Sequence, residues 1–480
     1  MLSPSILALS KALVPELLFT AGIILLLLLE FLGVLRRRSL AFGIAAALIL
    51  SYPVLLYGTA LSEERVFHDS LQRDSRALMF QLIFSVSTLL TLIMAYADPY
   101  LFRQRVSDEL APTADKGKGY GEFLFVLLST LLALQVLGMA QQLILIFVAL
   151  EMIAIGSYVL VHFRFRAAAA EASLKYLLFG MLSSGLMLYG ISWLYGLSGE
   201  LTIQGLSTLN YSPMAFLALV LFAAGLFFKL SAPPFHFWAP DVYEGSPTSV
   251  AAFLSVATKA AGLIILMRLY TLFSAWPFFQ EFLIGIALLA LIIGNTVALW
   301  QQGSKRMLAY SAVSHTGFLL IGVLAARTEV VLFYLWVYLL LNYGAFALVQ
   351  VIETATRSEK LQAFSGYGRR KPALGVALVI LMLGLTGLPP TAGLTVKFWL
   401  FAALWDQYGG DPLWLTLLIV GVLSSVVGLF YYLKMPYYAF FREAQPEKAE
   451  STASGWLTAL ISITSALVVV LLFYNRWLFG

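Results

Sequence analysis

The amino-acid sequence predicts an all-α polytopic membrane protein with about fourteen transmembrane helices. Of the 480 residues, 61% are hydrophobic and only 11% are charged, and the mean hydropathy is +0.88. Soluble domains carry about a quarter charged residues, so this composition excludes a soluble domain. Apolar windows of about 20 residues, the length that crosses a bilayer as a helix, recur along the chain. A doubled proline interrupts two of them, at Pro233-Pro234 and at Pro389-Pro390.

The first apolar window, residues 12–34, contains Glu16 and Glu30 and is followed by Arg36-Arg37-Arg38. This charge order is the reverse of a secretory signal peptide, so we expect a retained first helix. The remaining windows lie near residues 39–61, 77–98, 121–140, 142–162, 173–197, 213–239, 249–271, 277–301, 306–326, 329–354, 372–405, 413–438 and 455–475.

Basic residues between these windows predict the orientation of the chain. With the N-terminus on the outer side, eighteen Lys and Arg residues fall on the inner side and six on the outer side. This asymmetry follows the positive-inside rule and supports an even number of spans. We therefore expect a multi-pass protein of the bacterial cytoplasmic (inner) membrane, with both termini on the periplasmic side. The net charge of +5 reflects basic inner loops rather than nucleic-acid binding.

The chain contains no cysteine, which excludes disulfides, thiolate metal sites and cysteine-bound iron–sulfur clusters. Electron transfer, if it occurs, is therefore expected in another subunit. His236, Asp241 and Glu244 are the residue types of a metal site, but they follow the first doubled proline closely, and we expect no metal there.

Ionisable residues lie deep within the predicted spans, where a lysine costs about 2.5–3.5 kcal/mol on insertion scales. Arg268 and Lys434 lie near helix ends, from which they can reach the membrane interface. A single buried charge often serves only to hold two helices together. Several ionisable residues at a similar depth in the membrane instead predict a proton path. This set comprises Glu151, Lys175, Lys229, Lys259, His315 and Lys397.

This set has the chemistry that proton conduction requires. A desolvated lysine loads and unloads a proton near neutral pH, and a nearby carboxylate favours its protonated form. Glu151 beside Lys229 would therefore form a switchable pair. Lys259 and His315 would relay the proton, since histidine titrates nearest neutrality, and Lys397 would be the terminal group.

The doubled prolines also predict an internal repeat. They fall in the seventh and twelfth helices, and an odd offset of five helices inserts the second unit upside down relative to the first. Helices four to eight and nine to thirteen would then form two inverted units, in which Glu151 corresponds to His315 and Lys229 to Lys397. The predicted divisions are residues 1–120, an N-terminal three-helix segment and loop; 121–271, the first repeat; 272–440, the second repeat; and 441–480, the C-terminal helix.

Several runs resemble the antiporter-like subunits of respiratory complex I, and among these most closely subunit N, the counterpart of mitochondrial subunit 2. The matching runs are KLSAPPFHFWAPDVYEGSPT at 229–248, ATKA at 257–260, Lys175-Tyr176, WLYGLSG at 193–199, Ala309-Tyr310-Ser311 and GLPPTAG at 387–393. The resemblance covers most of the chain. A lysine at position 397 separates the sequence from the M-type paralogue, which carries glutamate there.

The resemblance implies a membrane-arm subunit of a proton-pumping NADH:quinone oxidoreductase. Glu151, Lys229, Lys259 and Lys397 would form the proton path and Lys175 would assist, whereas the central position of His315 varies among related subunits. No cofactor is expected in this chain. NADH, flavin, iron–sulfur clusters and quinone would be bound by other subunits, and the partners would be the M-, L-, K-, J-, A- and H-type membrane subunits.

Two alternatives remain open from the sequence. The chain could be a subunit of a Mrp-type sodium/proton antiporter, or a membrane scaffold with a vestigial channel. The complete set of buried charges disfavours the scaffold, and Lys397 together with the subunit N-like runs favours the oxidoreductase over the antiporter.

Overall fold

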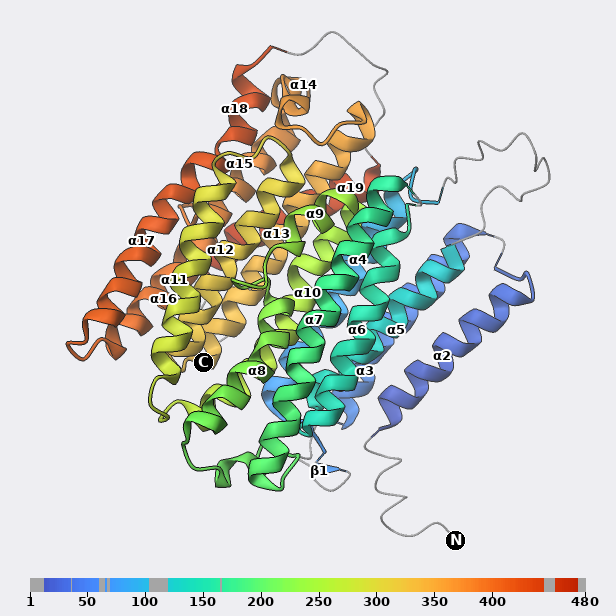
Figure 1. The fold of residues 1–480 in the computed structure, drawn as a ribbon. Helices are drawn as coiled ribbons and strands as arrows, with labels where there is room; N and C mark the ends of the chain where they lie inside the picture. The colour runs from blue at the N-terminus through green and yellow to red at the C-terminus, as the bar shows by residue number, and fades with distance from the viewer. Residues whose placement is uncertain are drawn as a thin grey trace. The chain divides into compact units, whose positions relative to one another are not determined.

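The structure is a computed structural model that describes residues 13–35, 37–59, 65–66, 70–102, 120–164, 166–443 and 454–473. It confirms the predicted all-α membrane fold (Figure 1). Thirteen helices in these ranges are long and apolar enough to cross a bilayer. The remaining predicted window, 372–405, forms two shorter helices. Both termini and the loops at 103–119 and 444–453, which carry part of the orientation prediction, lie outside the described residues.

The chain divides into two compact units, and each is described by itself. The first comprises residues 1–225 and 245–247. In it α2 packs against α3 and α5, α4 against α3 and α5, and α6 between α5 and α7. Its elements are α2 (Val14–Phe31), α3 (Arg38–Thr59), the antiparallel strands β1 (Arg65–Val66) and β2 (Leu71–Gln72), α4 (Ser75–Ala97), α5 (Tyr120–Met139), α6 (Leu143–His162), α7 (Ala167–Ser198), η1 (Gly205–Thr208) and most of α8 (Pro213–Leu230).

The second unit comprises residues 226–244 and 248–480. Here α12 packs against α10, α11, α13 and α16, and α13 also packs against α15, α16 and α19. Its elements after α8 are α9 (Trp238–Gly245), α10 (Thr248–Phe273), α11 (Phe279–Ala298), α12 (Ser304–Leu324), α13 (Thr328–Thr356), η2 (Leu361–Phe364), α14 (Tyr367–Arg370), α15 (Pro372–Thr386), α16 (Ala392–Gln407), α17 (Pro412–Tyr432), α18 (Lys434–Phe441) and α19 (Gly455–Phe473).

Both helices with a doubled proline are interrupted, as the sequence predicts. Proline has no N–H to donate, so α8 ends at Leu230 and α9 begins only at Trp238. α15 ends at Thr386, where Gly387 adopts φ +89°, a conformation that favours glycine. α16 then begins at Ala392. Each interruption leaves backbone carbonyl groups at a helix end without their usual intrahelical donors.

Burial differs strongly among the helices. Every residue of α10 from Thr248 to Tyr270 is buried, whereas α7 exposes large apolar side chains such as Leu178 and Met181. Lipid contact is favourable for such side chains, so α7 suits a lipid or subunit boundary and α10 the interior of its unit. Lys259 therefore lies within the enclosed part of α10.

Candidate functional site

Lys259 lies at the interruption between α8 and α9. Its side chain is fully buried, and Nζ donates to the carbonyl oxygen of Leu230 and to Thr316 Oγ1, the latter at 2.8 Å. The Thr316 hydroxyl also donates to the Leu230 carbonyl. The carbonyl at the end of α8 is thus an acceptor for the lysine of α10.

Lys397 lies at the second interruption in the same manner. Its Nζ donates to the carbonyl oxygens of Thr386 at 2.8 Å and Leu385 at 3.3 Å, at the end of α15. The amino group also lies 4.3 Å from the centroid of the Phe318 ring. As with Lys259, the partners among the described residues carry no formal charge, so a proton can leave without breaking an ion pair.

His315 lies close to both of these lysines. The next residue, Thr316, bonds to Lys259, and the His315 ring centroid lies 6.0 Å from that of Phe318, the ring that Lys397 contacts. The His315 ring forms hydrogen bonds through Nδ1 to the Tyr334 hydroxyl at 2.6 Å and through Nε2 to the Tyr432 hydroxyl at 3.0 Å. Three predicted residues are therefore brought together in the second unit.

Glu151 and Lys229 occupy different units. Glu151 in α6 is partly buried and accepts a hydrogen bond from the Ser184 hydroxyl of α7. Lys229, near the end of α8, is 3% exposed, and its Nζ lies 5.5 Å from the Phe228 ring centroid. Their pairing stays a prediction.

Lys175 in α7 has a more exposed side chain than the other candidates. Its side chain is 41% exposed, and Nζ lies 2.8 Å from Glu171 Oε1 one turn earlier on the helix. Such an i,i+4 pair contributes a few tenths of a kcal/mol when exposed. The assisting role of Lys175 stays a prediction.

The sequence analysis missed the role of two tyrosines and one lysine. Tyr334 and Tyr432 hold the His315 ring, although aromatic residues in a membrane protein usually indicate packing or an interfacial belt. Lys305 lies between the predicted spans 277–301 and 306–326, so it is one of the eighteen basic residues expected on the inner side, but it is 1% exposed in the first turn of α12. The sequence hint that Lys305 is buried in an ion pair was the presence of carboxylates, Glu353 and Glu359, at and just beyond the end of the predicted span 329–354.

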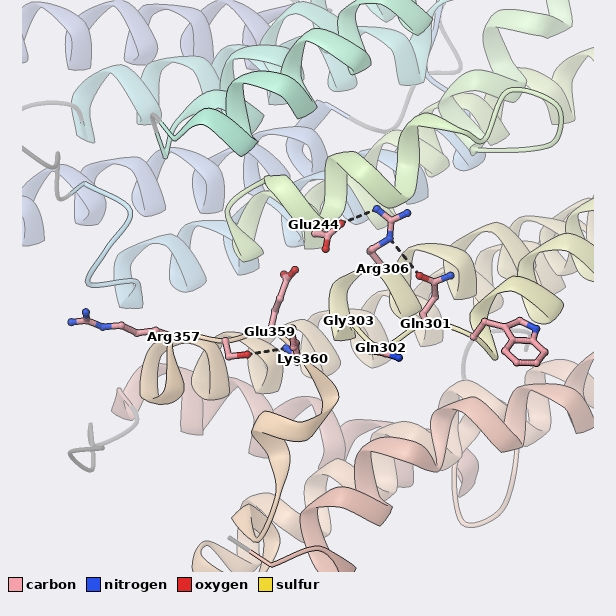
Figure 2. Close-up of a pocket in the computed structure, with 10 residues that line it drawn as sticks. Glu244, Gln301, Gln302, Gly303, Arg306, Arg357, Glu359 and Lys360 are labelled. Atoms are coloured by element: carbon pink, nitrogen blue, oxygen red, sulfur yellow. Dashed lines mark hydrogen bonds and ion pairs between the residues drawn. The ribbon is translucent and has the colours of Figure 1, made fainter. Parts of the chain in front are cut away.

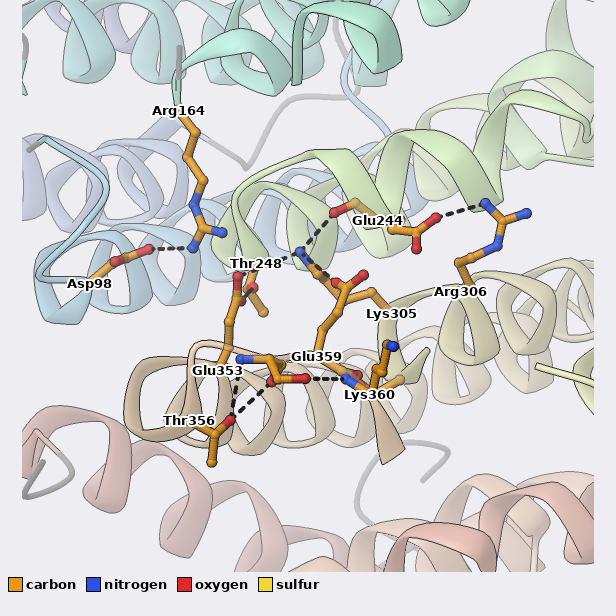
Figure 3. Close-up of polar contacts among 12 residues, drawn as sticks. Asp98, Arg164, Glu244, Thr248, Lys305, Arg306, Glu353, Thr356, Glu359 and Lys360 are labelled. Atoms are coloured by element: carbon orange, nitrogen blue, oxygen red, sulfur yellow. Dashed lines mark hydrogen bonds and ion pairs between the residues drawn. The ribbon is translucent and has the colours of Figure 1, made fainter. Parts of the chain in front are cut away.

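Lys305 is the centre of a charged cluster (Figure 3). Its Nζ lies 3.1 Å from Glu359 Oε2 and 3.8 Å from Glu353 Oε1, and donates to the Glu244 carbonyl at 2.9 Å. The Thr248 hydroxyl donates to the second oxygen of Glu353. Burial raises the pKa of Glu359, an effect that the neighbouring Lys305 ammonium opposes. We call these residues the Lys305 cluster.

The three residues considered for a metal have other partners. Arg306 Nη1 lies 2.6 Å from Asp241 Oδ1 and 2.8 Å from Glu244 Oε2, so both carboxylates are in ion pairs. His236 is buried with its ring centroid 4.4 Å from that of Phe237. In the ranges that the structure describes, no group of three His, Cys, Asp or Glu side chains could hold a metal ion.

A cavity of about 550 Å³ lies beside the Lys305 cluster (Figure 2). Two residues that contact Lys305, Glu244 and Glu359, also line this cavity. The lining also includes Arg306, Arg357 and Lys360. The mixed charge of this lining suits water and ions rather than an apolar ligand.

The first unit holds a separate buried polar network. Glu16 Oε1 accepts hydrogen bonds from the Tyr52 hydroxyl and from Arg73 Nη2, each at 2.7 Å. Farther along α4, the Gln81 and Gln135 side-chain amides each donate to the backbone carbonyl of the other residue, at 3.1 and 3.2 Å. These contacts join α2, α3, α4 and α5, so we interpret them as structural.

Comparison with known proteins decides the family. Residues 140–428 match the family described as NADH:quinone oxidoreductase/Mrp antiporter, TM. The chain is 31% identical to NADH-quinone oxidoreductase subunit N 2 of Chloroherpeton thalassium and 34% identical to subunit N of Chlorobium chlorochromatii. Both alignments cover 96% of this chain and 91% of the relative. The chain belongs to the subunit N family of NADH-quinone oxidoreductases. The predicted resemblance is thereby confirmed.

The chain is also similar to subunit 2 of NAD(P)H-quinone oxidoreductases and to chains of solved membrane complexes. The chain is 37% identical to NAD(P)H-quinone oxidoreductase subunit 2 of a Picosynechococcus strain, over 88% of this chain and 80% of the relative. Among solved structures, it superposes on a chain of respiratory complex I from Thermus thermophilus with a TM-score of 0.78 at 29% identity, covering 96% of this chain and 97% of that one. A chain of the Mrp complex from a Dietzia species gives 0.81 at 19% identity, covering 98% and 95%, which shows a shared fold.

Proposed function

We propose that this chain is a proton-translocating subunit in the membrane arm of a NADH:quinone oxidoreductase, and that quinone reduction in other subunits drives it. Membership of the subunit N family supports this proposal. The observation that carries it is the arrangement in the second unit. Lys259 and Lys397, both buried, each bind backbone carbonyls at a helix interruption, and His315 lies close to both.

The proton moves along this line through His315, whose two ring nitrogens are hydrogen-bonded to the Tyr334 and Tyr432 hydroxyls. A proton released by Lys259 reaches the ring through water and one of these hydroxyls, the imidazole releases a proton from its other nitrogen to the second hydroxyl, and deprotonated Lys397 accepts a proton through water. Loss of the proton from Lys259 leaves the Leu230 carbonyl with a donor, because the Thr316 hydroxyl also bonds to it. The interrupted helix thereby tolerates both protonation states of Lys259.

Glu151 and Lys229 form the controlling pair of the proposed path. Moving the carboxylate away favours release of the Lys229 proton, and its return favours reloading. Lys175 assists from the first third of α7. The Ser184 hydroxyl that bonds to Glu151 offers the carboxylate a second partner when it is not paired.

The remaining features of the proposal follow from the family. The chain carries no redox group itself, and NADH, flavin, iron–sulfur clusters and quinone are bound by other subunits. Its partners are the M-, L-, K-, J-, A- and H-type membrane subunits, in the bacterial inner membrane with both termini outside. The two helix interruptions mark inverted repeats, helices four to eight and nine to thirteen.

Proton uptake into inverted membrane vesicles tests the proposal. In the intact complex, Glu151→Gln, Lys229→Ala and Lys397→Ala are expected to lower NADH-driven proton uptake at normal subunit abundance. Lys434→Ala is the matched control, since Lys434 also donates to a backbone carbonyl, that of Leu299, but lies at a helix end. Normal uptake by all three variants would refute the proposed path.

A Mrp-type sodium/proton antiporter is the second candidate. The matched family covers both kinds of protein, and the fold is shared with a Mrp complex chain. Co-purification followed by identification of the subunits distinguishes the two. NADH dehydrogenase subunits among the partners support the oxidoreductase, whereas their absence together with sodium-dependent proton exchange supports the antiporter.

A further inference from the structure

Helix α13 carries a buried polar face. Tyr338, Asn342, Gln350 and Glu353 follow one another at spacings of four, eight and three residues, which places them on one side of a helix. Tyr338, Asn342 and Gln350 are at most 2% exposed. Polar side chains buried along most of a transmembrane helix are costly and usually mark a pathway for substrate or ions.

One end of this face meets the Lys305 cluster. Glu353 contacts Lys305, which in turn contacts Glu359 on the wall of the cavity (Figures 2 and 3). Side-chain exposure falls from 23% at Glu359 to 17% at Glu353 and 2% at Lys305. Glu359 thus lines the cavity and Glu353 lies behind it, at the end of α13 that the basic loops predict to be the inner side.

The other end of the face meets His315. The Tyr338 ring centroid lies 4.7 Å from that of His315, and Asn342 is one turn farther along α13. The Tyr338 hydroxyl interacts with the Asn342 side chain. Within the distance and angle limits of a well-formed hydrogen bond, however, neither this hydroxyl nor Asn342 Nδ2 has a partner among the described residues. A buried polar group without a partner costs about 1–3 kcal/mol, and in protein interiors such groups commonly bind water.

Phe346 separates the two polar sections. It lies four residues from both Asn342 and Gln350, it is fully buried, and its ring centroid lies 6.1 Å from that of Tyr243. The eight residues between Asn342 and Gln350 span about 12 Å of helix. A buried apolar section excludes water, and in channels such sections gate conduction.

We propose that the polar face of α13 is the proton uptake route of this chain. Glu359 takes a proton from water in the cavity and passes it, through water, to Glu353 on the same lysine. Glu353 then passes its proton to water beside Gln350, three residues earlier on α13. The proton crosses the section at Phe346 when that section is hydrated. Water beside Asn342 and Tyr338 then passes it to the Tyr334 hydroxyl, which is hydrogen-bonded to His315 Nδ1 and gives the ring a proton after His315 has released its own toward a lysine. This inference rests on the proposed function.

Isosteric substitutions in the intact complex test the route. Asn342→Leu and Gln350→Met keep the side-chain volume and remove the polar atoms. Each is expected to lower NADH-driven proton uptake into inverted vesicles at least threefold at normal subunit abundance. Asn342→Ser, which still binds water, is expected to keep more than half of the uptake. Gln81→Met is the matched control, because Gln81 is an equally buried amide that joins α4 to α5.

Substitution of Phe346 allows a second measurement, the decay of an imposed pH gradient. If Phe346 had a purely structural role, this decay would not change. Phe346→Ala is expected to hydrate the constriction, so that an imposed pH gradient decays at least twofold faster across vesicles that contain the variant complex than across wild-type vesicles. Phe333→Ala is the matched control, since Phe333 is also buried on α13 but packs against Trp399.

The outcomes separate this inference from the proposed function. If Asn342→Leu and Gln350→Met pump normally while Lys259→Ala does not, the route is wrong and the proposed function stands. If Lys259→Ala and Lys397→Ala also pump normally, the proposed function fails as well. Equal loss in Asn342→Ser and Asn342→Leu, or an unchanged decay of the gradient in Phe346→Ala, would also overturn the route.

Discussion

Replacing Lys305 with methionine removes the cation that holds two carboxylates at the start of α12. Nζ lies 3.1 Å from Glu359 and 3.8 Å from Glu353. At an effective dielectric constant of about 20, these separations correspond to attractions of about 5 and 4 kcal/mol before desolvation is subtracted. Removing one partner of a buried pair costs about 3–5 kcal/mol. Since both carboxylates keep some solvent contact, we expect a loss of about 3 kcal/mol, the lower end of that range.

The loss is expected to depend on pH. Burial raises the pKa of Glu359, and Lys305 opposes this effect. Without Lys305 the pKa of Glu359 rises further, so its charged form destabilises the fold more. A carboxyl group whose pKa is raised by folding weakens stability as pH rises through that pKa. The deficit of the Lys305→Met variant is therefore expected to be largest at pH 7.5 and smaller at pH 5.5.

Thermal denaturation of the detergent-solubilised complex, followed as loss of soluble subunit, measures this deficit. Adding Glu353→Gln and Glu359→Gln to Lys305→Met is expected to restore about half of the lost stability, because no buried charge is then left unpaired. Lys434→Met is the control. A deficit that is the same at both pH values and is not reduced by the two glutamine substitutions would refute this reasoning.

Three further predictions concern the site and its support. Thr316→Val is expected to slow NADH-driven proton uptake several-fold, because the helix-end carbonyl then depends on Lys259 alone as its donor. Arg73→Met leaves the carboxylate of Glu16 without its cation, and we expect the thermal stability to fall by an amount equivalent to about 3 kcal/mol. Gly393→Ala places Cβ 2.0 Å from a backbone oxygen of α15, so we expect about 1–3 kcal/mol of destabilisation and reduced subunit abundance in membranes.

Matched variants control these three experiments. Thr316→Ser keeps the hydroxyl and is expected to pump normally, so equal slowing by Val and Ser contradicts a role for the hydroxyl. Arg73→Lys keeps a cation and is expected to be less destabilised than Arg73→Met. Gly285→Ala adds a methyl group where no atom lies within 4 Å, and equal abundance of the Gly285 and Gly393 variants would contradict the packing argument.

The membrane-spanning helices could be read from the sequence because a bilayer imposes two local requirements. A span must be apolar over about 20 residues, and each backbone group must find its partner within the helix. Doubled prolines violate the second requirement, which is why the interruptions after Leu230 and Thr386 were predictable. Both features depend only on residues that are neighbours in the chain.

The buried ionisable residues could also be found from the sequence, but their partners could not. Depth within a span identified Lys259, His315 and Lys397. In the sequence, Lys229 is the lysine next to the first interruption. In the structure, the Leu230 carbonyl at that helix end accepts a hydrogen bond from Lys259 instead. Which lysine reaches a given carbonyl depends on how α8, α10 and α12 pack, and hydropathy contains no information on that packing.

The environment of Lys305, at a helix end, could not be predicted from the sequence either. Its position at the start of α12 indicated a basic loop residue, because charges at such positions usually face water. In the folded chain α9, α13 and the loop that carries Glu359 surround it, and it is 1% exposed. The sequence by itself determined the family, the transmembrane helical fold and the residues that carry charge into the membrane. Only the tertiary structure decided which of those charges face one another, because that depends on contacts between residues far apart in the chain.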